Sequence, residues 1–433
     1  MQYTQAIDYL YSQLPMFQRI GSAAYKPGLE RVEALDEALG HPHRQYPTIH
    51  IAGTNGKGSV SHLMAAALQS QGYKVGLYTS PHLVDFRERI RVKGSMIPRG
   101  AVADFVEEYA PEPGPDAPSF FELTMAMAFD WFARSNVDIA VIETGMGGRL
   151  DSTNIITPLM SVITNVSYDH MQFLGHTLPE IASEKAGIIK EGVPVIIGER
   201  QDPDICKVFE EKARAMNAPL LYASDNPFGF EVSRDKYSGQ WHISHPLGIN
   251  SWCPLGGDYQ AHNILTALHA LARLESHPTS PEAIYRGFNK VQEMTGLMGR
   301  WMQTGEAPTI ICDTGHNVAG IESNVGQLLN WQLLHPEGQL HIVIGFVSDK
   351  NVEFILPLFP ERANYYFTQA SVPRAMPVEQ LADIATQTGL QGMLSASVPE
   401  AVDQALSFAT PDDLIFIGGS TFVVADYLAM LQQ

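Results

Sequence analysis

The segment Gly53-Thr54-Asn55-Gly56-Lys57-Gly58-Ser59 constrains the fold of this chain more than any other. A β-rich run, residues 47–52, precedes it, and apolar residues at helical spacing follow it from Val60 to Leu68. At such a turn glycines let backbone N–H groups converge on phosphate oxygens, while the lysine and serine can contact phosphate or its Mg²⁺. Two residues, instead of the usual four, separate the first glycine from Gly-Lys, and Gly58 intrudes before Ser59. We interpret the segment as a phosphate-binding loop; a glycine-rich turn without a ligand is the alternative.

Continuous apolar runs separated by helix-length segments predict two α/β domains. The runs cover residues 47–52, 74–79, 138–143, 159–166 and 193–198, and later 309–312, 340–346, 363–367 and 414–418. Runs of this kind are typical of parallel strands covered on both faces. The flexible segment Gly296–Gly299 separates the two sets. We therefore expect an N-terminal phosphate-loop domain with a parallel sheet, residues 1–296, and a smaller Rossmann-like α/β domain, residues 297–433.

The charge balance limits the partners of the chain. Its 433 residues carry a formal charge of -19, whereas binders of nucleic acid or anionic membranes need a broad basic face. Residues 57–93 contain six basic and two acidic residues, so an anionic ligand would meet a local positive segment. The three cysteines are widely spaced, the start has no secretory pattern, and no apolar run approaches about 18 residues. We expect a cytoplasmic protein that binds neither nucleic acid nor membranes.

Polar residues follow several of the predicted strands. Ligands of open parallel sheets lie beyond the carboxyl ends of strands, where Ser80 is expected, although Ser-Pro also begins ordinary turns. Glu143 ends a strand opposite the phosphate loop and could bind nucleotide-bound Mg²⁺, or it could be a solvated loop acid. His170 follows the next strand, but a lone histidine is more often structural. Lys185 comes later in the chain, and its role is not explained by phosphate binding, because Lys57 already fills that role.

The motifs together resemble one family. They are GTNGKGS (53–59), TSPHL (79–83) with Glu88-Arg89-Ile90, Phe121-Glu122 with Thr124, ETGMGGRLDSTN (143–154), Asp169-His170, EKAG (184–187), His262-Asn263, Gly299-Arg300, and Asp313 with His316-Asn317. This order is similar to that of folylpolyglutamate synthases and dihydrofolate synthases, which belong to the Mur ligase superfamily. The resemblance runs from about residue 17 to the C-terminus. GTNGKGS with GGRLD distinguishes this branch from the cell-wall Mur ligases.

The resemblance implies roles for individual residues. ATP would contact Gly53, Thr54, Asn55, Gly56, Lys57, Gly58, Ser59, Asn263, Arg300 and Asp313. Two Mg²⁺ ions would be held by Ser80, Glu143, His170 and Lys185, the last of these carbamylated and so converted from a cation into a carboxylate. Lys57, Lys185 and His316 would be catalytic. Substrate contacts would fall on Arg19, Gly21, Ser22, Ser119, Phe121, Leu150, Asp151, Ser152 and Ser420.

Two segments depart from the family pattern. The common Asp-Gly-Ala-His-Asn-Pro stretch is here Asp313-Thr314-Gly315-His316-Asn317-Val318, and the last strand leads into Gly418-Gly419-Ser420-Thr421-Phe422. Asp313, His316 and Ser420 are retained, so the implied chemistry is unchanged. The departures bear on the shape of the loop and on the placement of glutamate.

The implied activity is ATP-dependent ligation of L-glutamate to a folate or to dihydropteroate by a monomeric enzyme. The acceptor carboxylate attacks the γ-phosphate to give an acyl phosphate and ADP, and the glutamate amine then displaces phosphate. One alternative is a Mur-type amino-acid ligase acting on a nucleotide-sugar peptide, against which GGRLD and the short N-terminal region argue. A second is a regulatory module that binds or hydrolyses ATP and joins nothing. The sequence leaves open whether dihydrofolate synthesis, polyglutamate extension or both occur.

Overall fold

The computed structural model describes residues 1–14, 28–110, 117–235, 238–245 and 250–432, and the statements below concern these residues. The chain divides into two compact units. The second unit contains the chain from Met298 onward together with Leu255–Asp258, and the first contains the rest of the described chain. The division after Leu297 lies inside the segment Gly296–Gly299, whereas the transfer of Leu255–Asp258 to the second unit has no counterpart in the sequence pattern.

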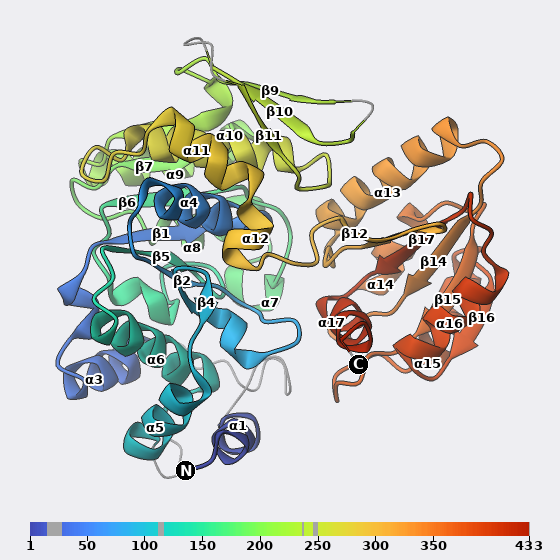
Figure 1. Ribbon diagram of the computed structural model, residues 1–433, viewed down its shortest axis with the longest axis horizontal. Coiled ribbons are helices and arrows are strands. Elements are labelled where there is room, and N and C mark those ends of the chain that lie inside the picture. The colour runs from blue at the N-terminus through green and yellow to red at the C-terminus, as the bar shows by residue number, and fades with distance from the viewer. Residues whose placement is uncertain (15–27, 111–116, 236–237, 246–249, 433) are drawn as a thin grey trace. The chain divides into compact units, whose positions relative to one another are not determined.

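The first unit is built on an eight-stranded sheet with the order β4-β3-β2-β5-β1-β6-β7-β8 (Figure 1). Its strands are β1 (Thr48–Ala52), β2 (Val75–Tyr78), β3 (Ile90–Val92), β4 (Ser95–Met96), β5 (Ile139–Glu143), β6 (Met160–Ile163), β7 (Val195–Ile197) and β8 (Leu220–Tyr222). The six strands from β2 to β8 in this order pair in parallel, and β3 and β4 are antiparallel. Every residue of β1, β2, β5 and β6 is buried, as expected where helices cover both faces.

Helices cover both faces of this sheet. They are α1 (Tyr3–Ser12), α3 (Glu30–Ala38), α4 (Lys57–Gln71), α5 (Arg99–Tyr109), α6 (Phe120–Arg134), α7 (Met171–Leu174), α8 (Leu178–Ala186), α9 (Pro203–Ala215), α10 (Gln260–Arg273), α11 (Pro281–Asn289) and α12 (Val291–Thr295), with 3-10 turns η2 (Pro42–Gln45), η3 (Phe86–Arg89), η4 (Ser152–Ile155) and η5 (Ala223–Asp225). α4 packs against α10, α11 and α12 on one face, while α3 and α6 lie on the other (Figure 1). The apolar face of α4 is buried throughout from Val60 to Leu68, and the helix ends at Gly72 with a positive φ of 114°.

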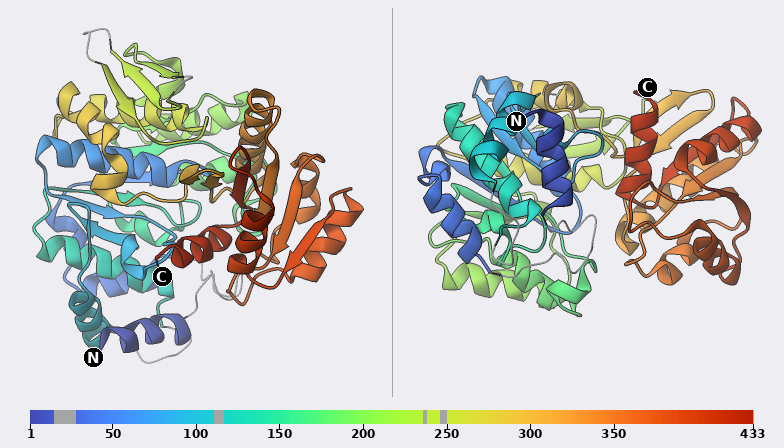
Figure 2. Two further views of the ribbon diagram at one scale, coloured as in Figure 1. Left: turned by 45° about the vertical axis from the view of Figure 1, so that its right-hand side comes forward. Right: turned by 90° about the horizontal axis from the view of Figure 1, so that it is seen from below.

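A small antiparallel sheet completes the first unit. It has the order β11-β10-β9 and consists of β9 (Glu231–Arg234), β10 (Trp241–Ser244) and β11 (Asn250–Cys253). β9 contacts α10 and β11 contacts α11, so the small sheet lies over these helices (Figure 2). None of these three strands was predicted from the sequence.

The second unit contains a six-stranded sheet with the order β12-β13-β17-β14-β15-β16. The strands are β12 (Met302–Glu306), β13 (Thr309–Cys312), β14 (Leu340–Ile344), β15 (Asn364–Thr368), β16 (Gly392–Ser395) and β17 (Leu414–Gly418). Only β12 runs antiparallel to its neighbour. The helices are α13 (Val318–Leu334), α14 (Val352–Ile355), α15 (Val378–Gln387), α16 (Val398–Phe408) and α17 (Thr421–Met430), with the 3-10 turn η6 (Leu356–Leu358).

The predicted α/β class, with one mainly parallel sheet in each unit, is confirmed. Every apolar run identified in the sequence contains a strand, with ends that differ by no more than a few residues. The edge strands β4, β8, β12 and β16 and the short strand β3 beside β4 were not predicted, because these short strands lack a long continuous apolar run. No helix of the described chain is long and apolar enough to cross a lipid bilayer.

Candidate functional site

The phosphate loop joins the end of β1 to the beginning of α4. Gly53 has a φ of 148° and Gly56 a φ of 86°, a region that favours glycine. A Cβ on Gly53 would lie 1.8 Å from Oγ1 of Thr164, and one on Gly56 would lie 2.1 Å from Oδ1 of Asn263. Both glycines are therefore required by backbone conformation and by close neighbours. Gly56 is also the N-cap of α4, so the loop opens onto the positive end of the helix dipole.

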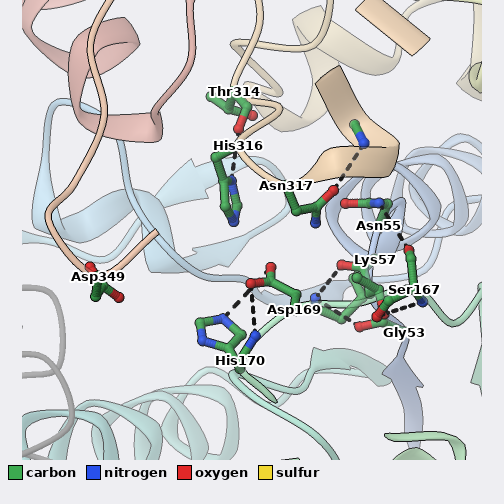
Figure 3. Close-up of polar contacts among 12 residues, drawn as sticks. Gly53, Asn55, Lys57, Ser167, Asp169, His170, Thr314, His316, Asn317 and Asp349 are labelled. Atoms are coloured by element: carbon green, nitrogen blue, oxygen red, sulfur yellow. Dashed lines mark hydrogen bonds and ion pairs between the residues drawn. The ribbon is translucent and has the colours of Figure 1, made fainter. Parts of the chain in front are cut away.

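The segment after β6 holds the phosphate loop in place. The Thr54 N–H donates to the Asn165 carbonyl at 2.9 Å, and the Asn55 N–H donates to Oδ1 of Asn165 at 3.0 Å. Oγ1 of Thr54 accepts from the Ser167 N–H at 3.0 Å, and Nδ2 of Asn55 donates to Oγ of Ser167 at 3.4 Å (Figure 3). These contacts support the loop from the end of the neighbouring strand β6.

Lys57 points back over the loop. Its ammonium donates to the carbonyl of Gly53 at 3.0 Å and to that of Thr54 at 3.1 Å (Figure 3). The positive charge therefore lies at the mouth of the loop, where it can neutralise a phosphate.

Gln260 links Ser59 of the phosphate loop to Asn263. It was not identified as a candidate site residue from the sequence. Its Nε2 donates to Oγ of Ser59 at 3.2 Å, and its Oε1 accepts from Nδ2 of Asn263 at 2.9 Å. All three residues are buried. Gln260 is the first residue of α10, and the spacing of Gln260 and Asn263 on one helix face was the available signal. Because Nδ2 of Asn263 is bound to Gln260, Oδ1 of Asn263 is directed at Gly56.

Ser80 and Glu143, both expected to bind metal, lie together. The parallel strands β2 and β5 are neighbours, and Ser80 follows one while Glu143 ends the other. The Ser80 N–H donates to Oε2 of Glu143 at 3.0 Å. Glu143 is 2% exposed, so its carboxylate is held inside the site rather than in a solvated loop.

His170 and Lys185 approach the same edge of the sheet. Nε2 of His170 lies 3.9 Å from Oδ2 of Asp169, whose Oδ1 accepts from the His170 N–H (Figure 3). Lys185 stands in the last turn of α8 and is 2% exposed. Burial, followed by the positive charge of Lys57, lowers the pKa of Lys185 to about 7, and Asp169 acts in the opposite direction. With a pKa of about 7, roughly half of the Lys185 side chains are neutral amines near pH 7, a far larger share than for an ordinary lysine.

The donor atoms fit Mg²⁺ only in combination with phosphate oxygens. No group of three or more His, Cys, Asp or Glu side chains in the described chain is arranged to hold a metal ion. Mg²⁺, however, commonly takes one or two protein oxygens and completes its shell with substrate phosphates and water. The Glu143 carboxylate and the Ser80 hydroxyl beside the phosphate loop are donors of that kind.

The residues expected at the acceptor site come from α6 and from the loop after β5. Ser119 is the N-cap of α6, and its Oγ accepts from the Glu122 N–H at 3.2 Å. The ring of Phe121 lies against Gly145, where a Cβ would be 2.5 Å from its Cζ. Leu150 and Ser152 are partly exposed on either side of the buried Asp151. Arg19, Gly21 and Ser22 lie outside the described residues.

The carboxylate of Asp151 is already engaged by its own loop. Its Oδ2 accepts from the Met146 N–H at 2.8 Å, and its Oδ1 accepts from the N–H and the hydroxyl of Thr153 at 3.0 and 2.5 Å. Burial raises the pKa of Asp151, while these hydrogen bonds lower it. Asp151 therefore organises the loop between Glu143 and η4, a role that the sequence pattern did not reveal.

Arg300, Asp313, His316 and Ser420 gather at one edge of the sheet in the second unit. Asp313 follows β13 and accepts from the Trp301 N–H at 2.7 Å and from Nδ2 of Asn324 at 2.9 Å. Arg300 donates to the hydroxyl of Thr314. His316 Nδ1 donates to the Thr314 carbonyl at 3.0 Å (Figure 3).

Ser420 follows β17 beside this group and caps α17, with its Oγ accepting from the Phe422 N–H at 3.0 Å. Asp313 and Ser420 thus both have structural hydrogen bonds besides the ligand contacts expected of them. All four residues, Arg300, Asp313, His316 and Ser420, lie in the second unit. Asp313 and Ser420 follow the neighbouring parallel strands β13 and β17, and Arg300 precedes β12, which runs antiparallel to β13.

Both parts of the chain match domains of one known family, the Mur ligases. Residues 51–271 match the Mur ligase middle domain, and residues 299–421 match the Mur ligase glutamate ligase domain. A relative from Haloferax volcanii, described as a probable bifunctional folylpolyglutamate synthase/dihydropteroate synthase, is 34% identical over 98% of this chain, which spans only 50% of that protein. The folylpolyglutamate synthase of Lacticaseibacillus casei is 31% identical over 98% of this chain and 97% of its own length.

Solved structures agree with this assignment. E. coli FolC in complex with DHPP and ADP has a TM-score of 0.85 and 30% identity, covering 100% of this chain and 98% of that one. A bifunctional folylpolyglutamate synthase/dihydrofolate synthase with Mn, AMPPNP and L-glutamate bound has a TM-score of 0.82 and 28% identity, covering 100% and 98%. With the phosphate loop, the Ser80–Glu143 pair and the two sheets on the same chain, this protein belongs to the folylpolyglutamate synthase and dihydrofolate synthase family of the Mur ligases.

Proposed function

We propose that this protein is an ATP-dependent ligase that joins L-glutamate to a reduced folate, and that it also accepts dihydropteroate. The observation that carries the proposal is the juxtaposition of the phosphate loop with Ser80 and Glu143 at the carboxyl edge of one sheet. Relatives that match this chain over nearly their whole length are named for these two activities. The chain would act as a monomer in the cytoplasm.

The residues of this chain would mainly position the substrates and neutralise the negative charge of the phosphates. The phosphate loop and Lys57 would hold the β- and γ-phosphates through backbone N–H groups and one ammonium. Gln260 would keep Ser59 and Asn263 in place around the nucleotide. Mg²⁺, bound through Ser80, Glu143 and His170, would supply neutralisation of the transferring phosphoryl group. The acceptor carboxylate would attack the γ-phosphate, and the resulting acyl phosphate would be open to the glutamate amine.

Lys185 would act as its carbamate. A neutral amine is the form that reacts with CO₂, and burial beside Lys57 favours the neutral form. The product is a carboxylate, which changes Lys185 from a repelled cation into a ligand for a second Mg²⁺. Its position at the end of α8, against the loop that contains Gly148, supports a role within the metal site.

The second unit would contribute the remaining contacts. Arg300 and Asp313 would contact the nucleotide, and His316 and Ser420 would act on or bind the glutamate and the activated acceptor. Support comes from their grouping at one sheet edge within a region that matches the glutamate ligase domain. At the acceptor site, Ser119, Phe121, Leu150, Asp151 and Ser152 would surround the pterin.

One assay tests the proposal against its alternatives. ADP formation is measured with dihydropteroate, with tetrahydrofolate and with a UDP-muramyl acceptor, each with and without L-glutamate. We expect stimulation only when a pterin acceptor and glutamate are both present, with a product heavier by one glutamate. Stimulation by the UDP-muramyl acceptor would identify a Mur-type amino-acid ligase. ADP release that ignores both co-substrates would identify a nucleotide-hydrolysing module.

A further inference from the structure

A fully buried histidine, His50, lies next to the segment that joins β5 to η4. His50 is in β1, three residues before the phosphate loop, and is 0% exposed. Its Nε2 lies 2.8 Å from Oγ1 of Thr153, a residue 103 positions later in η4. The same hydroxyl lies 2.5 Å from Oδ1 of Asp151. A continuous polar chain thus runs from the centre of the sheet to the carboxylate of the loop after β5.

The direction of each hydrogen bond in this chain is fixed by chemistry. Both oxygens of Asp151 accept backbone N–H groups, Oδ1 from Thr153 and Oδ2 from Met146. The side chain therefore acts as an acceptor, and the Thr153 hydroxyl donates its single proton to it. Oγ1 of Thr153 can then only accept from His50, which requires that Nε2 of His50 bear the proton. Nδ1 of His50 is buried and has no hydrogen-bond partner in the described chain. His50 is therefore the neutral tautomer protonated at Nε2.

The surroundings of His50 favour this neutral form. Burial, and then the positive charge of Lys190, lower the pKa of His50 to about 3. The Lys190 ammonium donates to the carbonyl of Asn154 at 2.8 Å, so it anchors the far end of the same loop. A pKa this low keeps the imidazole uncharged near neutral pH, so its Nε2–H can donate to Thr153 there.

We propose that His50 is a positioning residue for acceptor binding, acting through the Thr153 hydroxyl to orient the Asp151 carboxylate. The inference rests on the proposed function, in which Asp151 contacts the pterin. A threonine hydroxyl can rotate toward several acceptors; the imidazole N–H occupies its lone pair and leaves the proton directed at Asp151. Met146 fixes the second oxygen of Asp151 from the other side, so both oxygens are set before the acceptor arrives.

The kinetic test compares two substitutions of one buried side chain. His50→Leu keeps the apolar contacts but removes the donor, and His50→Gln retains an N–H near the Nε2 position. We expect the KM for dihydropteroate to rise about fivefold in His50→Leu, the change that one ordinary hydrogen bond makes, and to return toward the wild-type value in His50→Gln. The Kd for ATP should not change. His269→Leu, which alters a buried histidine of α10, is the matched control and should leave both constants unchanged.

A double-mutant cycle tests whether His50 acts through Thr153. In a Thr153→Val background the hydroxyl is absent, so His50→Leu should cause no further rise in the acceptor KM. Additive effects, an equal change in the ATP Kd, or failure of His50→Gln to restore the KM would each overturn the proposal.

A spectroscopic measurement separates this inference from the proposed function. In ¹⁵N-histidine-labelled full-length protein, the resonances lost in His50→Gln should be those of a neutral ring protonated at Nε2 and should not titrate between pH 5 and 8. A ring protonated at Nδ1, or one that titrates, would overturn the inference whatever the enzyme does. A wild-type protein that joins glutamate to no pterin acceptor would instead refute the proposed function, while the ¹⁵N signals would still report whether the His50–Thr153 link exists.

Discussion

The backbone N–H of Ser80 donates a 3.0 Å hydrogen bond to Oε2 of Glu143, which joins the ends of the parallel strands β2 and β5. The register of these strands, with Tyr78 opposite Ile142, places the two residues at the same edge of the sheet. The carboxylate is thereby oriented by the backbone rather than by a flexible side chain. If Glu143 binds a metal ion as we propose, its carboxylate would already be oriented before the nucleotide binds.

Glu143→Gln should abolish ligation without unfolding the protein. The amide oxygen can still accept from Ser80, but the negative charge needed for Mg²⁺ is lost, so we expect ADP formation to fall about 100-fold. The thermal midpoint should stay close to that of the wild type. Glu211→Gln, an exposed carboxylate of α9, is the control. Near-normal glutamate-dependent ADP release in Glu143→Gln would contradict the metal assignment.

Lys57→Ala should likewise remove activity while the fold is retained. Lys57 donates only to two carbonyls of its own loop, so its loss costs little stability, whereas the phosphate loses a fixed positive charge. We expect a fall in ADP formation of roughly 100-fold, as for other groups that stabilise developing charge. Circular dichroism and ATP titration check the fold and the affinity. Unchanged turnover would show that the loop is only a turn.

Lys185→Ala should be inactive and should regain part of its activity with added acetate or another short carboxylic acid. The acid would replace the carbamate oxygens in the space left by the side chain. Lys207→Ala, an exposed lysine of α9, should be active and insensitive to acetate. Intact-protein mass spectrometry after gentle handling, or ¹³C NMR with labelled bicarbonate, detects the carbamate directly. An unmodified and dispensable Lys185 would refute this role.

Gln260→Leu should weaken nucleotide binding. The substitution removes the contacts to Ser59 and Asn263 and leaves two buried polar groups without this partner, which is worth about 1–3 kcal/mol or roughly a tenfold rise in the ATP Kd. The KM for the acceptor should change much less. Arg273→Ala, at the exposed end of the same helix, is the control. Calorimetric titration with ADP is the measurement, and an unchanged Kd would show that the bridge is dispensable.

Acid should destabilise the second unit through His341. This buried imidazole lies between the Tyr366 hydroxyl at 3.0 Å and Oδ2 of Asp413 at 3.3 Å. Burial lowers the pKa of His341, while Asp413 acts in the opposite direction. The unfolded chain therefore takes up the proton first as the pH falls below about 6.5, and this group lowers the free energy of unfolding by at most about 1.4 kcal/mol per pH unit.

The variant His341→Asn cannot titrate and should lose less stability between pH 7 and pH 5 than the wild type. Urea unfolding at pH 7, 6 and 5 measures the difference. His335→Asn, an exposed histidine of the same unit, should follow the wild-type curve. A decline in His341→Asn as steep as that of the wild type would rule out this cause.

Much of the architecture was predictable because it depends on local pattern. Apolar runs that are buried on both faces gave the central strands, and Gly72 ended α4 where its positive φ requires a glycine. Edge strands such as β4 and β16 were missed, since pairing on one side only imposes little on the sequence. Arg89 and Arg91 are buried although arginine side chains are mostly exposed in proteins, so residue type alone did not indicate their environment.

The sequence by itself determined the glycine-rich turn at residues 53–59, the strand ends that carry Ser80 and Glu143, and the α/β class of the fold. Only the tertiary structure decided how these residues are supported. Thr153 meets His50 across 103 positions and Gln260 meets Ser59 across 201, so no local pattern encodes either contact. The same is true of the low pKa of Lys185, which arises from burial and from Lys57. Residue type and spacing specify which groups are available, whereas burial and long-range contacts specify their charge and direction.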